Sequence, residues 1–304
     1  MIGRVLQGSG GTYRVRAGGR DLECTLRGRI KHGESGSVAV GDRVEIEELD
    51  DGSCRITEVL SRVRVLSRRA MARRRDQIMA ANLDQLAIVV AVTRPALDLH
   101  MLDRLLAVAE LNDLDPFIIC NKTDLADSLP PELDIYADLG YAVLPTSIPA
   151  SVGLSTLRER LVGRTTVLAG ASGVGKSSLL NALFPGLDLR VGDVGERKGR
   201  GRHTTTSAQL IPIDDETFIA DTPGIQHFVP TGVGVDVLGE AFPDLRPFAG
   251  ECRFGDCRHR SEPGCAVLGA LADDLIDPRR YESYLALLEE AQVAEDAART
   301  SGNG

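Results

Sequence analysis

Gly170-Ala171-Ser172-Gly173-Val174-Gly175-Lys176-Ser177 follows the pattern G-x-x-x-x-G-K-S of a phosphate-binding loop. A β-branched run at 165–169 precedes it and a helical run at 178–184 follows, which is the context such a loop needs. Glycines let backbone N–H groups turn toward a polyphosphate, and the helix N-terminus favours anions. We expect Lys176 to reach the β- and γ-phosphates and Ser177 to ligate Mg²⁺. The candidate nucleotide-binding residues here are Gly170, Ala171, Ser172, Gly173, Val174, Gly175, Lys176, Ser177 and Ser178.

A second motif, Asn121-Lys122-Thr123-Asp124, reads N-K-x-D and follows an apolar run at 117–120. Guanine presents N1–H and an exocyclic amino group as adjacent donors, and the Asp124 carboxylate can accept both, whereas adenine lacks this pair. Lys122 would lie along the purine face, and Asn121 would brace the site. Alone, the motif is also compatible with Asp124 as a helix N-cap. Beside a phosphate-binding loop it predicts a guanine nucleotide.

A third set of residues would sense the γ-phosphate. Asp221-Thr222-Pro223-Gly224 reads D-x-x-G, in which Asp221 would hold Mg²⁺ through a water and the Gly224 N–H would bond the γ-phosphate. Within Arg202-His203-Thr204-Thr205-Thr206, Thr205 is our candidate for completing the Mg²⁺ shell, with its two threonine neighbours as alternatives. Ile225 stands where regulatory GTPases carry a water-positioning Gln, so intrinsic hydrolysis should be slow. His203 or a partner would then position the water, although a structural His203 is an equal alternative.

The rest of the central region alternates strand and helix patterns. Buried-type strands are expected at 85–92, 117–120 and 141–144, with an amphipathic helix at 100–112, and further strands at 207–213 and 217–220. This alternation predicts a parallel, helix-covered α/β sheet that binds nucleotide at the carboxyl ends of its strands. Pro145-Thr146-Ser147, just after the third strand, stands where GTPases place a loop that contacts guanine O6, and Ser147 is our candidate within it.

The order of the motifs is unusual, because N-K-x-D precedes the phosphate-binding loop instead of following D-x-x-G. A sheet survives such a circular permutation when the old chain ends lie close together, since every strand keeps its neighbours. The chain then leaves the nucleotide-binding domain directly after D-x-x-G, so whatever follows residue 224 is expected to respond to the nucleotide.

The N-terminal region has an all-β pattern and a basic charge. Short alternating runs separated by glycine turns over residues 1–62 predict a small barrel, of the OB or the SH3-like type. Residues 1–75 hold 16 Lys+Arg and 10 Asp+Glu, a net of +6, which leaves −15 for the remainder of a chain whose net charge is −9. Seven arginines at 62–75 could track a phosphate backbone or form a solvated linker. A polyanion partner is therefore expected for this end, with ordinary charge segregation as the alternative.

The C-terminal region carries Cys252, Cys257, His259 and Cys265 in the spacing C-x4-C-x-H-x5-C. Three thiolates and one imidazole form a closed tetrahedral zinc set, so we expect one structural zinc ion per chain. Helices should surround it, including one that begins at Asp277-Pro278. The chain has no run long enough to span a bilayer and no signal-peptide pattern at 1–6, so a cytoplasmic protein without membrane contact is expected.

Together these motifs resemble the circularly permuted, small-subunit-dependent GTPase A family of bacteria (RsgA, also called YjeQ). The string Gly201-Arg202-His203-Thr204-Thr205-Thr206 and the C-x4-C-x-H-x5-C spacing are the most specific parts. The resemblance implies an α/β fold: a circularly permuted P-loop GTPase domain between an N-terminal OB-type β-barrel and a C-terminal helical zinc-knuckle domain. It also implies binding to the 30S subunit and 16S rRNA late in assembly, with faster hydrolysis on that particle.

We therefore expect three domains: an RNA-binding OB-fold over 1–72, the permuted GTPase domain over 73–235 and the zinc-binding domain over 236–304. The leading hypothesis is a monomeric GTPase that hydrolyses GTP to GDP, with Mg²⁺, in response to the 30S subunit. A GTP-gated RNA-binding scaffold with incidental hydrolysis is the alternative. A nucleotide kinase is disfavoured by the guanine motif.

Overall fold

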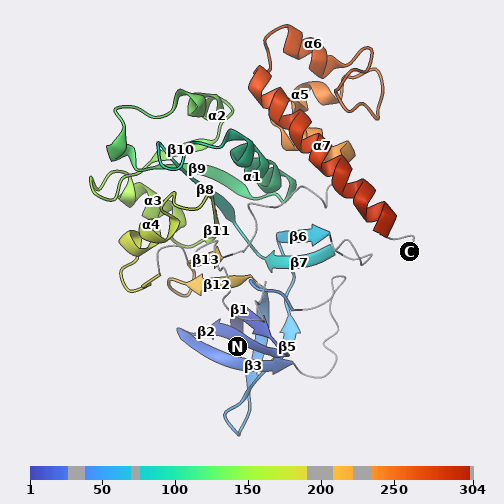
Figure 1. The fold of residues 1–304 in the computed structure, drawn as a ribbon. Coiled ribbons are helices and arrows are strands. Elements are labelled where there is room, and N and C mark those ends of the chain that lie inside the picture. The colour runs from blue at the N-terminus through green and yellow to red at the C-terminus, as the bar shows by residue number, and fades with distance from the viewer. Residues whose placement is uncertain (27–37, 70–75, 190–207, 222–234, 302–304) are drawn as a thin grey trace.

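A computed structural model describes residues 1–26, 38–69, 76–189, 208–221 and 235–301 of the chain (Figure 1). The barrel lies at one end, the α/β sheet in the middle and a group of C-terminal helices on the far side of the sheet. Within the described ranges, no helix is both long and apolar enough to cross a membrane.

The N-terminal barrel is closed and has the strand order β1-β2-β3-β5-β4. Its strands are β1 (Ile2–Ser9), β2 (Thr12–Ala17), β3 (Arg20–Leu26), β4 (Arg43–Glu48) and β5 (Cys54–Val59). β3 and β5 pair in parallel, and an antiparallel β1–β4 pair closes the barrel. This five-stranded order is the OB-type barrel, which resolves the choice that the sequence pattern left open. Side chains alternate between the two faces of each strand, and those on the inner face fill the barrel. The residues of this core are Val5, Val15, Ala17, Cys24, Val38, Val44, Ile46, Cys54 and Ile56.

A two-stranded hairpin, β6 (Val65–Arg69) and β7 (Asp76–Ala81), joins the barrel to the sheet. Residues 62–69 are not a solvated linker, because Arg62 Nε and Nη2 lie 2.6 and 2.7 Å from the buried Asp42 carboxylate. Arg64 likewise pairs with Asp84 and Asp113. The remaining arginines of the expected basic segment, at 73–75, fall outside the described residues.

The central sheet has six strands in the order β10-β9-β8-β11-β13-β12. These are β8 (Gln85–Ala91), β9 (Asp115–Asn121), β10 (Ala142–Pro145), β11 (Thr165–Ala169), β12 (Gln209–Pro212) and β13 (Phe218–Asp221). Five run in parallel as expected. β12 departs from the expected parallel sheet: it pairs antiparallel with β13, because residues 213–217 join the two by a short turn. The strands before the phosphate-binding loop complete one side of the sheet, as the permuted order predicts.

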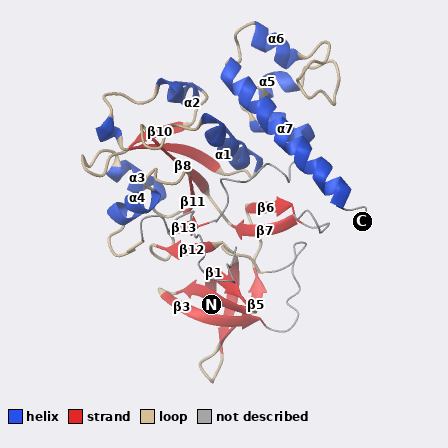
Figure 2. Cartoon of the chain, in the orientation of Figure 1, coloured by secondary structure: helices blue, strands red, loops and turns tan. Residues whose placement is uncertain are grey.

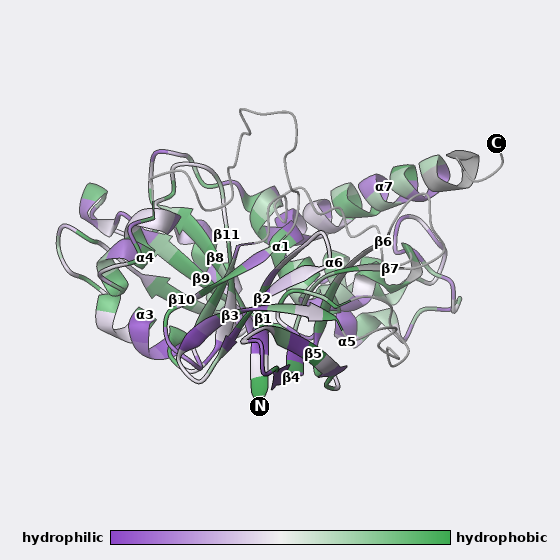
Figure 3. Ribbon diagram, turned by 90° about the horizontal axis from the view of Figure 1, so that it is seen from below, coloured by the Kyte–Doolittle hydropathy of each residue, from purple (hydrophilic) through white to green (hydrophobic). Residues whose placement is uncertain are grey.

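Helices cover both faces of this sheet (Figure 2). They are α1 (Leu99–Leu111), α2 (Asp134–Asp138), α3 (Leu154–Leu161) and α4 (Lys176–Leu183), with the short 3-10 turns η1 (Thr123–Leu125) and η2 (Pro131–Leu133). Along β8, Ile88 and Val90 join the core under α1, whereas Val89 joins the core under α3 and α4. A strand buried on both faces must be apolar throughout, and β8 and β9 are accordingly coloured mainly as hydrophobic in Figure 3.

The C-terminal region consists of η4 (Val235–Ala241), α5 (Arg246–Ala249), α6 (Ala266–Ala272) and the long α7 (Pro278–Ser301). Asp277 caps α7 by accepting from the Arg279 N–H at 2.8 Å, as the sequence predicts. α7 rests on α1 of the sheet domain. At this contact Arg280 donates to both Asp103 on α1 and Asp244, and Tyr136 also donates to Asp103 at 2.8 Å.

Candidate guanine-nucleotide site and metal centre

The phosphate-binding loop joins β11 to α4, as its sequence predicts. Gly170 has φ +139°, and a Cβ there would lie 2.1 Å from the Val89 carbonyl oxygen of the neighbouring strand β8. Gly175 has φ +102°, and its Cβ would lie 2.4 Å from Asn121 Nδ2. Both positions therefore require glycine, because the backbone conformation disfavours a side chain and the neighbours leave no room for one.

Lys176 is almost fully buried at the first position of α4. Its ammonium donates to the carbonyls of Gly170 at 2.8 Å and Ala171 at 2.9 Å, so the cation lies within the curve of the loop. The adjacent Ser177 is also buried. The Lys176 ammonium and the backbone N–H groups at the N-terminus of α4 thus lie close together, an arrangement suited to a polyphosphate.

The guanine motif contacts this loop directly, although 46 residues separate Asp124 from Gly170 in the sequence. Asn121, at the end of β9, donates from Nδ2 to the Val174 carbonyl at 2.9 Å. Lys122 donates from Nζ to the Gly173 carbonyl at 2.7 Å and to the Arg94 carbonyl. The end of β9 and the phosphate-binding loop therefore form one connected unit, as the pairing of the two motifs predicts.

Asp124 is exposed, and its carboxylate accepts a hydrogen bond from Ser147 Oγ at 2.6 Å. Ser147 is itself buried and accepts from the Ala150 N–H at 3.2 Å. The structure thus brings Ser147 to the carboxylate expected to read guanine. This contact fixes the direction of the Asp124 carboxylate while leaving it open to solvent.

Thr146 lies in the Pro145-Thr146-Ser147 stretch expected near guanine O6, but its contacts were not predicted from the sequence. Its hydroxyl donates to Asn121 Oδ1 at 3.1 Å, and its carbonyl accepts from the Thr123 N–H at 3.2 Å. Asn121 in turn donates to the Val174 carbonyl, so Thr146 supports the phosphate-binding loop through Asn121. Its position directly after a buried strand, between Pro145 and Ser147, was the available sequence signal.

Asp221 ends β13, which pairs with β11, and its side chain is buried at the same edge of the sheet as the loop. The remaining candidates, His203, Thr204, Thr205, Thr206 and Gly224, fall outside the described residues, as does Ile225. The structure therefore brings together the phosphate-binding loop, the guanine motif, Ser147 and Asp221.

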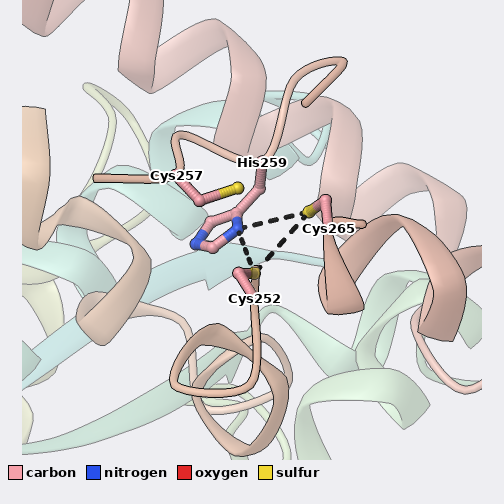
Figure 4. A group of neighbouring side chains, drawn as sticks. All are labelled: Cys252, Cys257, His259 and Cys265. Carbon is pink, nitrogen blue, oxygen red and sulfur yellow. Dashed lines mark hydrogen bonds between the residues drawn. The ribbon is translucent and has the colours of Figure 1, made fainter. Parts of the chain in front are cut away.

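The cysteine and histidine side chains converge as their spacing predicts (Figure 4). All four ligand atoms lie within 4.8 Å of one another; Cys252 Sγ is 3.9 Å from Cys265 Sγ and 3.4 Å from His259 Nδ1. A tetrahedral zinc ion with Zn–S bonds of about 2.3 Å keeps its sulfurs about 3.8 Å apart, so the donor set and the spacing both fit zinc. Burial lowers the pKa of His259, which favours the neutral imidazole that a metal needs, and raises the pKa of the Cys257 thiol to about 12.

Neighbouring groups hold this cluster's backbone in place. Tyr281 and Tyr284 of α7 donate from their hydroxyls to the carbonyls of His259 at 2.7 Å and Arg258 at 2.9 Å. Burial alone would raise the pKa of Glu262, but backbone N–H groups at 258, 260 and 261 donate to its carboxylate and bring the pKa to about 2. The loop is thereby fastened to α7 independently of any ion.

Comparison with known proteins covers nearly the whole chain. The sequence profile described as RsgA GTPase matches residues 59–230, and the RsgA N-terminal domain profile matches residues 2–56. The small ribosomal subunit biogenesis GTPase RsgA of Gemmatimonas aurantiaca is 43% identical over 95% of this chain and 96% of its own length. The protein of the same name from Moorella thermoacetica is 40% identical, over 97% of this chain and 99% of its own length.

Solved structures agree with the sequence matches. The crystal structure of YjeQ from Thermotoga maritima superposes with a TM-score of 0.74 at 32% identity, covering 96% of this chain and 98% of the other. YloQ, described as a circularly permuted GTPase, gives a TM-score of 0.72 at 26% identity, with 96% and 94% coverage. With its permuted sheet, OB-type barrel and Cys/His cluster, the chain belongs to the RsgA GTPase family.

Proposed function

We propose that this GTP hydrolase acts in the biogenesis of the small ribosomal subunit and hydrolyses GTP in response to that particle. The observation that carries the proposal is the hydrogen bond from Asn121 Nδ2 to the Val174 carbonyl, which joins a base-reading motif to a phosphate-binding loop. The named relatives are small ribosomal subunit biogenesis GTPases and match almost end to end. Their role is the one that we assign to this chain.

GTP would lie with its phosphates in the curve of residues 170–177. Lys176 would leave the Gly170 and Ala171 carbonyls for the β- and γ-phosphates, because a phosphate oxygen is the stronger acceptor for an ammonium. Ser177 and Asp221 would hold Mg²⁺, which neutralises charge that develops during phosphoryl transfer. Thr205 would complete the metal shell and Gly224 would contact the γ-phosphate, as their motifs predict.

The guanine base would be read by Asp124, with Lys122 along its face. Ser147 already fixes the Asp124 carboxylate at 2.6 Å, so the acceptor pair for guanine N1–H and N2–H₂ is oriented in advance. We expect Asn121 to act by holding the loop rather than by touching the base.

Hydrolysis needs an attacking water held in line with the γ-phosphate. Ile225 has no polar group with which to do this, so His203, or a group from the bound subunit, would position the water. We therefore expect slow intrinsic turnover by the free protein and faster turnover on the subunit.

The chain would divide into three domains, with boundaries at 72/73 and 235/236. The basic N-terminal barrel domain would bind 16S rRNA. The first boundary falls between the two strands of the β6–β7 hairpin.

One zinc ion held by Cys252, Cys257, His259 and Cys265 would be structural, since all four ligand positions belong to the protein. We further propose a monomer that works in the cytoplasm, where small subunits are assembled.

The test is GTP turnover by the full chain with and without purified 30S subunits. We expect stimulation by the subunit, and none by the large subunit as control. Equal turnover in the presence and absence of 30S subunits would refute the proposed function.

The base assignment has its own test in Asp124→Asn. An amide donates where guanine also donates, so we expect GTP affinity to fall about 10- to 100-fold while the affinity for xanthosine triphosphate rises. Asp127→Asn, an exposed carboxylate in the same loop, is the matched control and should change neither affinity. Unchanged base preference in Asp124→Asn would remove this residue from the site.

A further inference from the structure

A cavity of about 460 Å³ lies where the barrel meets the sheet domain. The barrel contributes Arg4 and Arg16 from β1 and β2 and Arg43 from the start of β4. The sheet domain contributes Asp215 and Glu216 from the β12–β13 turn. β1 lies against β12 here (Figure 1). The residues that line the cavity come from both domains.

The three guanidinium groups in this cavity differ in how they are held. Arg4 donates to the carbonyls of Gly41 at 3.0 Å and Asn82 at 3.4 Å, and its guanidinium lies 5.3 Å from the Phe218 ring centre. Burial lowers the pKa of Arg4, opposed by the nearby charges of Asp84 and Asp42, so its charge is partly compensated. Arg43 is exposed and makes no ion pair with any residue in the described ranges. The charge of Arg43 is therefore available to an anion.

The third guanidinium, that of Arg16, links the two domains. It donates to Asp21 of the barrel at 2.9 Å and to Asp215 of the β12–β13 turn at 3.1 Å. The Arg16 side chain is 24% exposed and that of Asp215 is 55% exposed. An ion pair this open is weak and screened by salt, so a phosphate that enters the cavity can compete with Asp215 for Arg16.

The β12–β13 turn is closed by hydrogen bonds of its own. Asp214 accepts from the N–H groups of Glu216 at 2.8 Å and Thr217 at 2.6 Å, and the Thr217 hydroxyl also accepts from Gly163 N–H at 2.9 Å. The turn and its two strands therefore form one hydrogen-bonded element. β12 follows the threonines at 204–206 in the sequence, and β13 ends at Asp221, the first residue of D-x-x-G.

We propose that this cavity binds a phosphodiester of RNA, and that the bound phosphate couples the barrel to GTP hydrolysis by taking Arg16 from Asp215 and releasing the β12–β13 turn. The coupling half rests on the proposed function, because it explains how the small subunit accelerates hydrolysis. The phosphate-binding half stands on the cavity and its arginines alone.

The binding half is tested with full-length Arg43→Ala and Arg16→Ala, by titration with 30S subunits and with a short RNA duplex over a range of salt concentrations. Each variant should lose affinity about five-fold, and its salt dependence should weaken by the equivalent of about one phosphate contact. Arg55→Ala, on the outer face of β5 away from the cavity, is the matched control for loss of one barrel charge. Affinities and salt slopes equal to those of Arg55→Ala would overturn the proposal.

The coupling half is tested with Asp215→Asn. Removing the competing carboxylate should strengthen RNA binding about two- to five-fold, yet lower the ratio of 30S-stimulated to intrinsic turnover, because the link to the turn is lost. Asp215→Glu keeps the charge and should restore both. If Asp215→Asn instead weakens RNA binding and lowers the turnover ratio together, the substitution has only disturbed packing, and the coupling is contradicted. If wild-type protein shows no stimulation, the proposed function fails and the coupling fails with it, whereas the Arg43→Ala affinity still decides the phosphate site.

Discussion

The contact of α7 with α1 differs from the contact of the barrel with the β12–β13 turn. In the first, Arg280 and Asp103 are each 2% exposed, and a continuous apolar core extends from α7 to Ala107 of α1. In the second, an open ion pair and a cavity lie between the two surfaces. A buried charge cluster is strongly destabilised when one partner is removed, whereas an exposed pair exchanges readily with solvent ions. The first contact thus suits permanent attachment and the second suits regulation.

Burial and neighbouring charges shift the pKa values of Asp103 and Arg280 at the contact between α7 and α1. Burial raises the pKa of Asp103, opposed by the neighbouring Arg280. Burial alone would lower the pKa of Arg280, but its two carboxylate partners, Asp244 and Asp103, raise it above its ordinary value. Arg280 therefore stays charged, and Asp103 is the group of this pair that becomes protonated as the pH falls.

Removal of zinc is expected to have the largest effect, and to be confined to the α7 side. Structural zinc contributes on the order of 10 kcal/mol to the folding of small zinc domains, although here the apolar core shares that role. After chelation, amide hydrogen exchange in α6 and at the start of α7 should rise by more than 100-fold, with β1–β5 unchanged as the internal control. A metal-free protein with full protection in α6 would contradict a structural ion.

Arg280→Ala should come next, lowering the free energy of unfolding by about 3–5 kcal/mol, because Asp103 and Asp244 are left buried without their cation. Urea unfolding followed by circular dichroism measures this. Arg279→Ala, at an exposed neighbour paired only with Asp277 among the described residues, should cost less than about 0.5 kcal/mol. Similar losses in the two variants would remove the distinction between the contacts.

The smallest effect is expected at the barrel contact. A double-mutant cycle of Arg16→Ala and Asp215→Ala should give a coupling energy of about 0.2–1 kcal/mol, falling further as salt is raised. Unfolding of the four proteins at low and high salt supplies the cycle. A coupling energy above 2 kcal/mol that is insensitive to salt would mean that this contact is as fixed as the one at α7.

Local patterns predicted most of the fold. The run at 165–169, the loop after it and the apolar strands expected at 85–92 and 117–120 are short-range signals, and the structure has a strand or loop at each, with β8 and β9 at 85–91 and 115–121. The convergence of Cys252, Cys257, His259 and Cys265 was also predictable, since only spacing and residue chemistry are involved.

Long-range arrangement was harder to predict. The sequence did not indicate the β6–β7 hairpin, because its arginines read as a charged segment and the Arg62 partner, Asp42, is distant in the chain. The antiparallel direction of β12 depends on a turn that Asp214 and Thr217 close. The contact of Thr146 with Asn121 was not predicted, because the partner is a side chain from another strand. The cavity between barrel and turn depends on how two domains meet, which no local pattern encodes.

The permuted strand order also has a consequence for the chain as it is synthesised. Of the six strands of the central sheet, β8, β9 and β10 emerge from the ribosome first and can pair with one another, because the crossovers between them are local. β8, which is buried along its entire length, then has an unpaired apolar edge until β11 follows. Unpaired edges of this kind are sites of aggregation and of chaperone binding. The permutation therefore leaves the nascent chain with an exposed apolar edge at the centre of its own sheet.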